Sequence, residues 1–300
     1  MAEMVPVEFW SYMNSAIKMK NQEAFLLAEV YNPNLYRDYI HKGKMDYLYD
    51  KVELYDTLKH IMKGYGSTDN LPAIYDGLAD IEHHMLHFLE NHDEQRIASK
   101  DFAGSAEKGK PAMVVSTCMS TSPTMFYFGQ NVGEPGDGNA GFGSETRTTI
   151  FDYWRFPAHQ RWMNYGKFDG GQLSPAEKEL NAFYKTLLSF SAKSSALMGE
   201  YKEIHSYNRN HTEGYNDKVF SFLRWNGDEQ LIIVSNFEET DHKFQLKLDL
   251  EVIQKWNLKN GSYKLHDQLS GTADRELIVK EEDAFIDLKI RGLESFIFKL

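Results

Sequence analysis

Hydrophobic residues in the first 130 positions fall into short continuous runs, and polar residues follow each run at once. Such runs are typical of parallel strands buried on both faces, which have no polar side. Apolar residues at helical spacing, such as Val7, Trp10, Met13 and Ile17, separate the runs. The predicted strands are 24–28, 45–49, 85–89 and 123–128, and the predicted helices are 6–20, 52–62, 71–81 and 110–119. This alternation predicts an α/β fold with a parallel sheet.

The pattern changes near residue 200. A helix is predicted from Ser174 to about Met198, because Ser is a good N-cap and is followed by Pro and then by an acid at the third helical position. Beyond it, short β-rich runs alternate with turns, and residues 226–228 (Asn-Gly-Asp) are a hairpin signal. We therefore expect an α/β domain over residues 1–200 and an antiparallel β-sandwich over residues 201–300.

Polar side chains follow two of the predicted buried strands. Asn91, His92 and Asp93 follow the run 85–89, and Glu29 follows the run 24–28. An Asn-His-Asp triplet by itself is more often a turn with an Asx cap than a functional site. Two acids at the carboxyl ends of parallel strands, however, are arranged as in the active site of an α/β barrel. A pair of carboxylates in different protonation states is suited to glycoside chemistry.

These two segments resemble motifs of the α-amylase family of glycoside hydrolases. Residues 28–31 (Ala-Glu-Val-Tyr) are similar to the family's general-acid segment, which closes the fifth barrel strand. Residues 88–93 (Phe-Leu-Glu-Asn-His-Asp) are similar to its F-x-x-N-H-D segment, which closes the seventh. The resemblance covers nearly all of the chain. It implies strands 5 to 8 of a (β/α)8 TIM barrel followed by the family's small β domain.

The resemblance also implies roles for individual residues. Glu29 corresponds to the catalytic proton donor, and Asp93 to an ionised residue that holds sugar hydroxyls and stabilises the transition state. His92 and Asn91 belong to the same subsite, with Asn91 shaping the loop. Tyr31 and Trp154 are candidate sugar-binding aromatics, together with Phe142 and Tyr153, although each ring could equally pack beneath its loop.

The first residues of the chain resemble the part of the family sequence that directly follows the nucleophile. In the family a G-F-R-x-D segment ends the fourth barrel strand, and residues 1–6 are similar to what comes after its Asp. On this reading the nucleophile lies one residue upstream of Met1; alternatively, Met1 is a true start and the opening a loosely matching leader. Glu3 falls in the turn beyond the strand end and is not expected to replace the nucleophile.

The sequence therefore predicts a fragment of a retaining α-glucoside hydrolase that acts on α-1,4-glucans or maltooligosaccharides and is inactive alone, because the covalent step needs the nucleophile. Two alternatives stay open. One is a glucan transferase of the same family, and the other is a non-catalytic carbohydrate-binding or partner protein.

Composition and charge limit the classes of molecule that the chain is expected to bind. The net charge is −11, with 33 Lys and Arg against 44 Asp and Glu, which disfavours nucleic acid and anionic membrane surfaces. No apolar stretch has the length of a membrane span. The single cysteine, Cys118, excludes an intramolecular disulfide; this favours an intracellular protein but leaves the periplasm open, so no compartment is assigned.

The sequence contains no clear metal motif. His83, His84 and His87 lie close together, but their spacing fits no helical zinc motif, so we assign no metal ligands. The resemblance makes Ca²⁺ the one cofactor to consider. Residues 129–134 are similar to the family's G-x-E-x-G segment except that Asn131 stands where an acid is common, which affects the detail of the sugar subsites.

Overall fold

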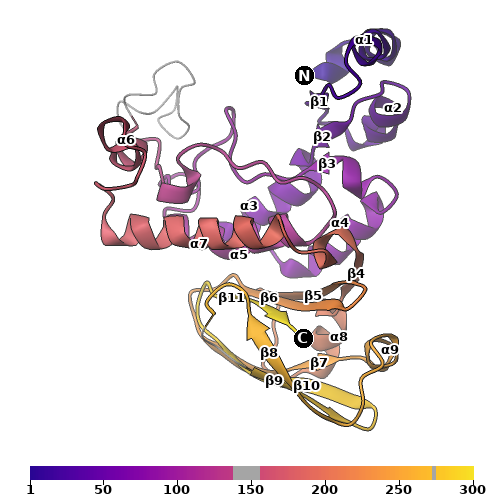
Figure 1. Cartoon of the computed structure of the whole chain (residues 1–300), viewed down its shortest axis with the longest axis vertical. Helices are drawn as coiled ribbons and strands as arrows, with labels where there is room; N and C mark the ends of the chain where they lie inside the picture. The colour runs from indigo at the N-terminus through magenta and orange to yellow at the C-terminus, as the bar shows by residue number, and fades with distance from the viewer. Residues whose placement is uncertain (138–155, 272–274) are drawn as a thin grey trace.

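The computed structural model describes residues 1–137, 156–271 and 275–300. We call the described residues before strand β4 (Glu200–Glu203) the α/β part and those from β4 onward the β part. Figure 1 shows the two parts stacked, with helices α5 (Gly109–Cys118) and α7 (Pro175–Ser191) lying above the strands of the β part. These names describe the structure only; the domain boundary between residues 200 and 201 stays a prediction.

Three short parallel strands form the sheet of the α/β part: β1 (Leu27–Ala28), β2 (Tyr47–Tyr49) and β3 (Met85–Leu86), in that order. The register pairs Leu27 with Tyr47 and Leu48 with Met85. All three strands lie inside the predicted runs 24–28, 45–49 and 85–89. The carboxyl ends of β1 and β3 therefore point to the same edge of one sheet, as the sequence predicts.

The predicted strand 123–128 is represented in the structure by an isolated parallel bridge. Thr124 pairs with His87, and the Met125 N–H donates to the His87 carbonyl at 2.8 Å. Pro123 accepts from the His87 N–H but has no N–H of its own to extend the ladder. The chain thus follows β3 for only a few residues before it enters the loop at 129–134.

Helices connect and cover these strands, as the apolar spacing predicts. The predicted helix 52–62 begins as a π-helical turn, Lys51–Tyr55. The backbone N–H of Leu54, in the first turn, donates to the Asp50 carboxylate. The helices of the α/β part are α1 (Val7–Lys20), α2 (Tyr36–His41), α3 (Asp56–Met62), α4 (Leu71–Leu78), α5 (Gly109–Cys118), α6 (Pro157–Met163) and α7 (Pro175–Ser191). No helix among the described residues combines the length and apolarity that a membrane crossing requires.

Helix α7 begins as predicted and ends earlier than predicted. Ser174 and Glu177 form the expected capping box, each accepting a hydrogen bond from the other's backbone N–H. The helix ends at Ser191 rather than near Met198. The last predicted turn forms separately at Ala196–Met198, because the Glu229 carboxylate of the β part accepts from the two serine hydroxyls and the N–H at 194–196.

The β part is one antiparallel sheet of eight strands in the order β4-β5-β6-β11-β8-β9-β10-β7. The sheet curls so that its two halves face each other, which produces the two layers expected of a sandwich (Figure 1). Apolar residues from both halves fill the space between them. Its elements are β4 (Glu200–Glu203), α8 (His205–His211), β5 (Val219–Asn226), β6 (Glu229–Asn236), β7 (His242–Leu248), α9 (Leu250–Lys255), β8 (Gly261–Asp267), β9 (Arg275–Lys280), β10 (Asp283–Ile290) and β11 (Ser295–Lys299).

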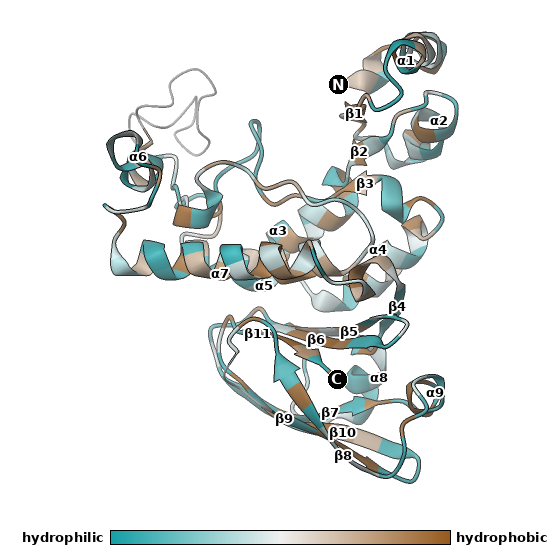
Figure 2. Cartoon of the chain, viewed as in Figure 1, coloured by the Kyte–Doolittle hydropathy of each residue, from teal (hydrophilic) through white to brown (hydrophobic). Residues whose placement is uncertain are grey.

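A shared hydrophobic core joins the two parts. Figure 2 shows hydrophobic positions along α5 and α7 and on the strands that face them. Buried side chains of α5 and α7 belong to the same cluster as Phe220, Phe222 and Ile233 of the β part. Arg224 of β5 is fully buried in this contact and donates to backbone carbonyls of the α/β part, among them Met119 at 2.8 Å and Gly199 at 3.2 Å.

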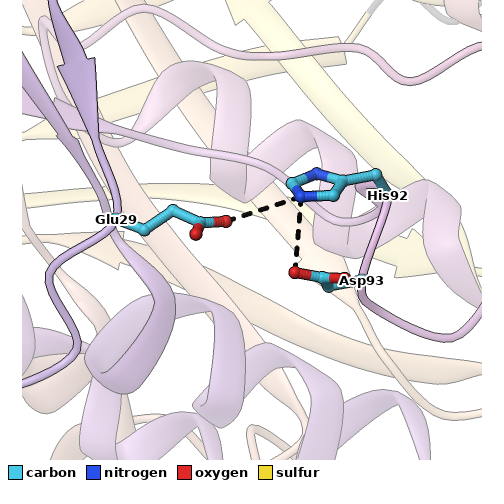
Figure 3. Close-up of side chains that lie close together, drawn as sticks. All are labelled: Glu29, His92 and Asp93. Atoms are coloured by element: carbon cyan, nitrogen blue, oxygen red, sulfur yellow. Dashed lines mark ion pairs between the residues drawn. The ribbon is translucent and has the colours of Figure 1, made fainter. Parts of the chain in front are cut away.

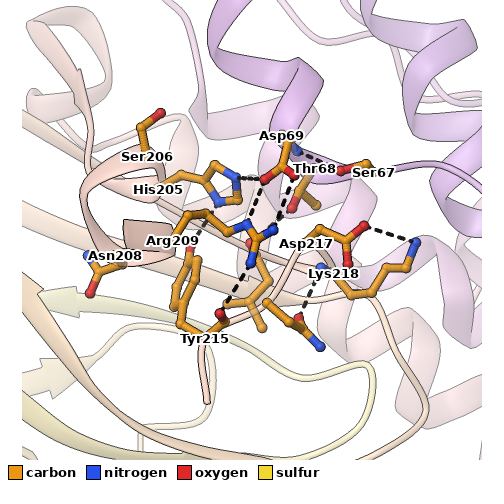
Figure 4. Close-up of polar contacts among 12 residues, drawn as sticks. Ser67, Thr68, Asp69, His205, Ser206, Asn208, Arg209, Tyr215, Asp217 and Lys218 are labelled. Carbon is orange, nitrogen blue, oxygen red and sulfur yellow. Dashed lines mark hydrogen bonds and ion pairs between the residues drawn. The ribbon is translucent and has the colours of Figure 1, made fainter. Parts of the chain in front are cut away.

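A second, polar contact lies beside this core (Figure 4). Asp69, in the short turn before α4, accepts from His205 Nε2 and from Arg209 Nε of helix α8, each at 2.8 Å. The Thr68 hydroxyl donates to the Val219 carbonyl at 3.0 Å. The two parts are thus held in one arrangement by apolar burial and by directional hydrogen bonds.

Candidate active site

The structure brings three of the predicted site residues together at the carboxyl edge of the parallel sheet. Glu29 directly follows β1, and His92 and Asp93 lie in the turn after β3. His92 Nε2 is 3.7 Å from Glu29 Oε1 and 3.3 Å from Asp93 Oδ2 (Figure 3). Their side chains are 21%, 41% and 53% exposed for Glu29, His92 and Asp93. The group is therefore open to a ligand from solvent.

Asn91 shapes the turn that presents His92 and Asp93. Its side-chain Oδ1 accepts the backbone N–H groups of Asp93 at 2.8 Å and Glu94 at 2.7 Å, which is an Asx turn. Asn91 is only 2% exposed. A turn and a functional site are therefore compatible in this triplet, since Asn91 is buried and the side chains of His92 and Asp93 are exposed.

Glu29 is surrounded by groups that donate hydrogen bonds. The Tyr31 hydroxyl donates to Oε1 at 3.3 Å, and the α-amino group of Met1 donates to Oε2 at 3.1 Å. Burial, followed by the charge of Glu29, raises the pKa of Tyr31, so this phenol remains a donor. Tyr31, predicted as a sugar contact, therefore lies against the predicted acid.

The carboxylate of Glu3 binds the backbone of the loop that follows β1. Its Oε2 accepts the backbone N–H groups of Tyr31 at 2.9 Å and Asn32 at 3.0 Å. The Ala2 N–H donates to the Glu29 carbonyl at 2.7 Å. The first residues thus lie against the end of β1 and fix the loop that follows it.

A cluster beside Asp93 was not predicted from the sequence. Glu94 accepts from the Tyr55 hydroxyl at 2.9 Å and pairs with Lys51 and Lys59, each at 3.3 Å. Burial opposes ionisation of Glu94, but Lys51, Tyr55 and Lys59 outweigh it and lower the pKa of this carboxyl. The only sequence signal was a pair of lysines eight residues apart beside the second strand.

Glu29, His92 and Asp93 also offer ligand atoms within 4.8 Å of one another, so they could hold a metal ion. One imidazole and two carboxylates suit a transition metal better than Ca²⁺, which takes six to eight oxygen ligands. These residues therefore do not fit the Ca²⁺ that the resemblance implies. The histidines considered earlier have backbone partners: His84 Nδ1 lies 2.8 Å from the Asp46 carbonyl and His87 Nδ1 2.7 Å from the Ser116 carbonyl.

The predicted aromatic platforms Trp154, Phe142 and Tyr153 lie outside the described residues. Asn131, the departure from the family segment, donates through Nδ2 to Asn181 of α7 at 2.7 Å. It therefore joins its loop to a helix and is not directed at Glu29.

Comparison with known proteins supports the fold of both parts of the chain. Residues 198–300 match the model of the α-amylase C-terminal all-β domain. The whole chain is similar to solved α-amylases from Anoxybacillus (19% identity, TM-score 0.69, 99% of this chain and 56% of that one) and Geobacillus thermoleovorans (18%, 0.69, 98% and 57%). It is also similar to the maltogenic α-amylase AmyB of Thermotoga neapolitana (18%, 0.66, 100% and 60%). No curated protein matches the chain by sequence. The chain spans a little over half the length of these structures.

Proposed function

Because the chain has the fold of the carboxyl-terminal part of an α-amylase, we propose that it is the corresponding part of a retaining α-glucoside hydrolase acting on α-1,4-glucans or maltooligosaccharides. The observation that carries the proposal is the meeting of Glu29, His92 and Asp93 at the open carboxyl edge of the sheet. This is the edge on which barrel enzymes build their active sites.

Glu29 is the proposed general acid and base. In the first step it transfers its proton to the glycosidic oxygen, while a carboxylate nucleophile attacks the anomeric carbon and the carbon–oxygen bond breaks. In the second step Glu29 takes a proton from water, whose oxygen attacks the anomeric carbon and releases the nucleophile. The second step thus returns Glu29 to its protonated form and frees the nucleophile for another cycle.

Asp93 and His92 are the proposed sugar-binding pair. An ionised Asp93 accepts hydrogen bonds from sugar hydroxyls and stabilises the positive charge that develops on the ring. His92 Nε2 lies between the two carboxylates, from which it can donate to a bound hydroxyl. The 41% exposure of His92 leaves this edge of the imidazole accessible.

The nucleophile is assigned to none of the described residues. Glu3 is bound by the loop after β1, and Glu94 is bound by two lysines. A residue joined to the Met1 amino group would lie next to Glu29, because that nitrogen is 3.1 Å from Oε2. We propose that residues 1–300 alone bind sugar without turnover and that turnover needs a carboxylate supplied upstream.

Names of two similar structures support the substrate class. The Geobacillus thermoleovorans enzyme was solved with acarbose, and AmyP, 17% identical over 99% of this chain, was solved with maltose. At this identity the likeness concerns the fold, so the choice of sugar is part of the proposal.

The first test compares Glu29→Gln with Glu23→Gln, an exposed acid before β1. In a chain extended upstream of Met1 by its coding sequence, Glu29→Gln should reduce maltoheptaose turnover at least about a thousandfold, because it removes the proton donor. Maltotriose affinity should change little, and Glu23→Gln should match the unsubstituted chain. Unchanged turnover in Glu29→Gln would refute the assignment.

Product analysis in the same assay distinguishes the two alternatives. Longer glucans formed from maltotriose would indicate a transferase. Sugar binding with no turnover even in the extended chain would indicate a non-catalytic carbohydrate-binding protein.

A further inference from the structure

A buried ion pair closes the loop that carries His92 and Asp93. Glu90 and Arg96 flank the loop and are 2% and 0% exposed. Arg96 Nη1 donates to Glu90 Oε2 at 2.7 Å. The other oxygen, Glu90 Oε1, accepts the backbone N–H of Ile97 at 2.8 Å. One carboxylate thus joins the two ends of the loop, through a side chain and through the backbone.

The guanidinium group of Arg96 also contacts the segment 124–128, which runs beside β3. Nη1 donates to the Phe128 carbonyl at 2.7 Å. The guanidinium carbon lies 4.5 Å from the ring centre of Tyr127 and 4.8 Å from that of Phe128. Arg96 therefore connects the loop after β3 to the chain segment at 124–128 that follows β3.

Space around this pair is tightly filled. A Cβ at Gly129, whose φ is +82°, would lie 3.0 Å from Glu134 Cβ and 3.8 Å from Arg96 Nη1. Burial raises the pKa of Glu90, while the Arg96 charge acts against that rise. The planar guanidinium group of Arg96 fixes the direction of its hydrogen bonds as well as supplying a positive charge. A lysine would supply the charge but not these fixed directions.

We propose that Arg96 is a positioning residue, which acts through the Glu90 carboxylate to hold His92 and Asp93 against Glu29. The proposal rests on the proposed sugar-binding role of this site. Arg96 touches no substrate in this account. The loop's inner residue, Asn91, sets the local turn, and the Glu90–Arg96 pair sets where that turn lies relative to β1 and to the segment at 124–128.

The test uses two readouts on the 300-residue chain, with Arg96→Lys as the main variant. The first is the pair of imidazole nitrogen signals of His92 in NMR spectra, identified by their absence in His92→Gln. The second is the affinity for maltotriose. We expect Arg96→Lys to shift the His92 signals and to weaken maltotriose binding about tenfold, since small displacements at a site reduce binding and rate steeply.

Arg224→Lys is the matched control. It changes another fully buried arginine, which donates hydrogen bonds to backbone carbonyls at the contact of the two parts. It should lower stability and leave the His92 signals and the maltotriose affinity unchanged. Glu90→Gln, which keeps the shape of Glu90 and removes its charge, is the second variant if Arg96→Lys does not fold, and it should shift the same signals.

A folded Arg96→Lys or Glu90→Gln chain with unchanged His92 signals would overturn the proposal. Equal signal shifts in Arg224→Lys would also overturn it, because the effect would then be one of general stability. If the unsubstituted chain does not bind maltotriose, the proposed function fails instead, and the NMR comparison still decides whether Arg96 positions His92.

Discussion

Three acids of the loop after β3, together with Glu29 after β1, show how the surroundings of a carboxylate decide what it can do. Glu90 is buried with Arg96, and Glu94 is held by two lysines and a tyrosine, so both carboxylates are committed to fixed partners. Asp93, between them in sequence, is 53% exposed. Glu29 is 21% exposed and faces the same opening. Glu29 and Asp93 are therefore open to a ligand from solvent, Glu90 is buried, and Glu94 is already paired with two lysines.

Replacing Asp93 by Asn tests the sugar-binding role at this scale. The amide keeps the size of the side chain and loses the negative charge that is proposed to hold sugar hydroxyls. Maltotriose affinity should fall about tenfold or more, because hydrogen bonds to charged groups contribute about 1.5–3 kcal/mol. The measurement is isothermal titration calorimetry on the 300-residue chain.

Asp76→Asn serves as the control for Asp93→Asn, since Asp76 is an exposed acid on α4. It should leave the affinity unchanged. Equal affinities for the unsubstituted chain and Asp93→Asn would remove Asp93 from the sugar-binding pair.

At the scale of elements, the start of helix α7 makes the most direct prediction. Ser174 and Glu177 form a complete capping box, with Pro175 at the first helical position. Ser174→Ala leaves N–H groups of the first turn without an acceptor and should lower the free energy of unfolding by about 1 kcal/mol. Ser191→Ala, at the far end of the same helix, should change it by less than about 0.5 kcal/mol in urea titrations. An equal effect of the two substitutions would contradict the capping argument.

The same helix shows where sequence reasoning succeeds and where it does not. The start depends on residues adjacent in sequence, and the pattern Ser-Pro-x-Glu predicts it correctly. The end depends on Glu229, which lies some 35 residues downstream and binds the serines at 194 and 195. No local pattern contains that contact, so the predicted end near Met198 is wrong by about two turns.

The strands and the site residues also include some that local sequence predicts and some that depend on distant contacts. The runs that end at Glu29 and before Asn91 predict β1 and β3, because polar residues mark the strand ends. The predicted strand at 123–128 has too few partners to form more than a bridge at Thr124. The predicted acids meet as expected, whereas Arg96 and the lysine cluster at Glu94 depend on packing between segments far apart in the chain.

At the scale of the whole molecule, the contact between the α/β part and the β part is built from two kinds of interaction. The apolar core shared by α5, α7 and the β strands contributes burial that does not depend on pH. The contact of Asp69 with His205 and Arg209 depends on charge. Titration of the histidine therefore separates the two contributions.

A neutral His205 can make both of its side-chain hydrogen bonds in the folded chain. Because Asp69 can only accept, Nε2 of His205 donates to it, and Nδ1 is left to accept from the Tyr215 hydroxyl at 3.0 Å. Burial lowers the pKa of His205, although the charges of Asp69 and Glu203 oppose the shift. Arg209, the other charged group that faces Asp69, lowers the pKa of that carboxyl and so favours its ionised form.

This arrangement fixes the sign of a pH effect. Because the pKa of His205 is lowered in the folded chain, the unfolded chain binds the proton more readily near and below a pH of about 6.5, so stability falls as the pH falls. Between pH 7 and pH 5 the unsubstituted chain should lose more stability than His205→Gln, whose amide does not titrate. Urea unfolding at the two pH values measures the difference. His211→Gln, which removes an exposed histidine of the same helix, should follow the unsubstituted chain. A His205→Gln chain that loses as much stability as the unsubstituted one would show that His205 does not control this contact.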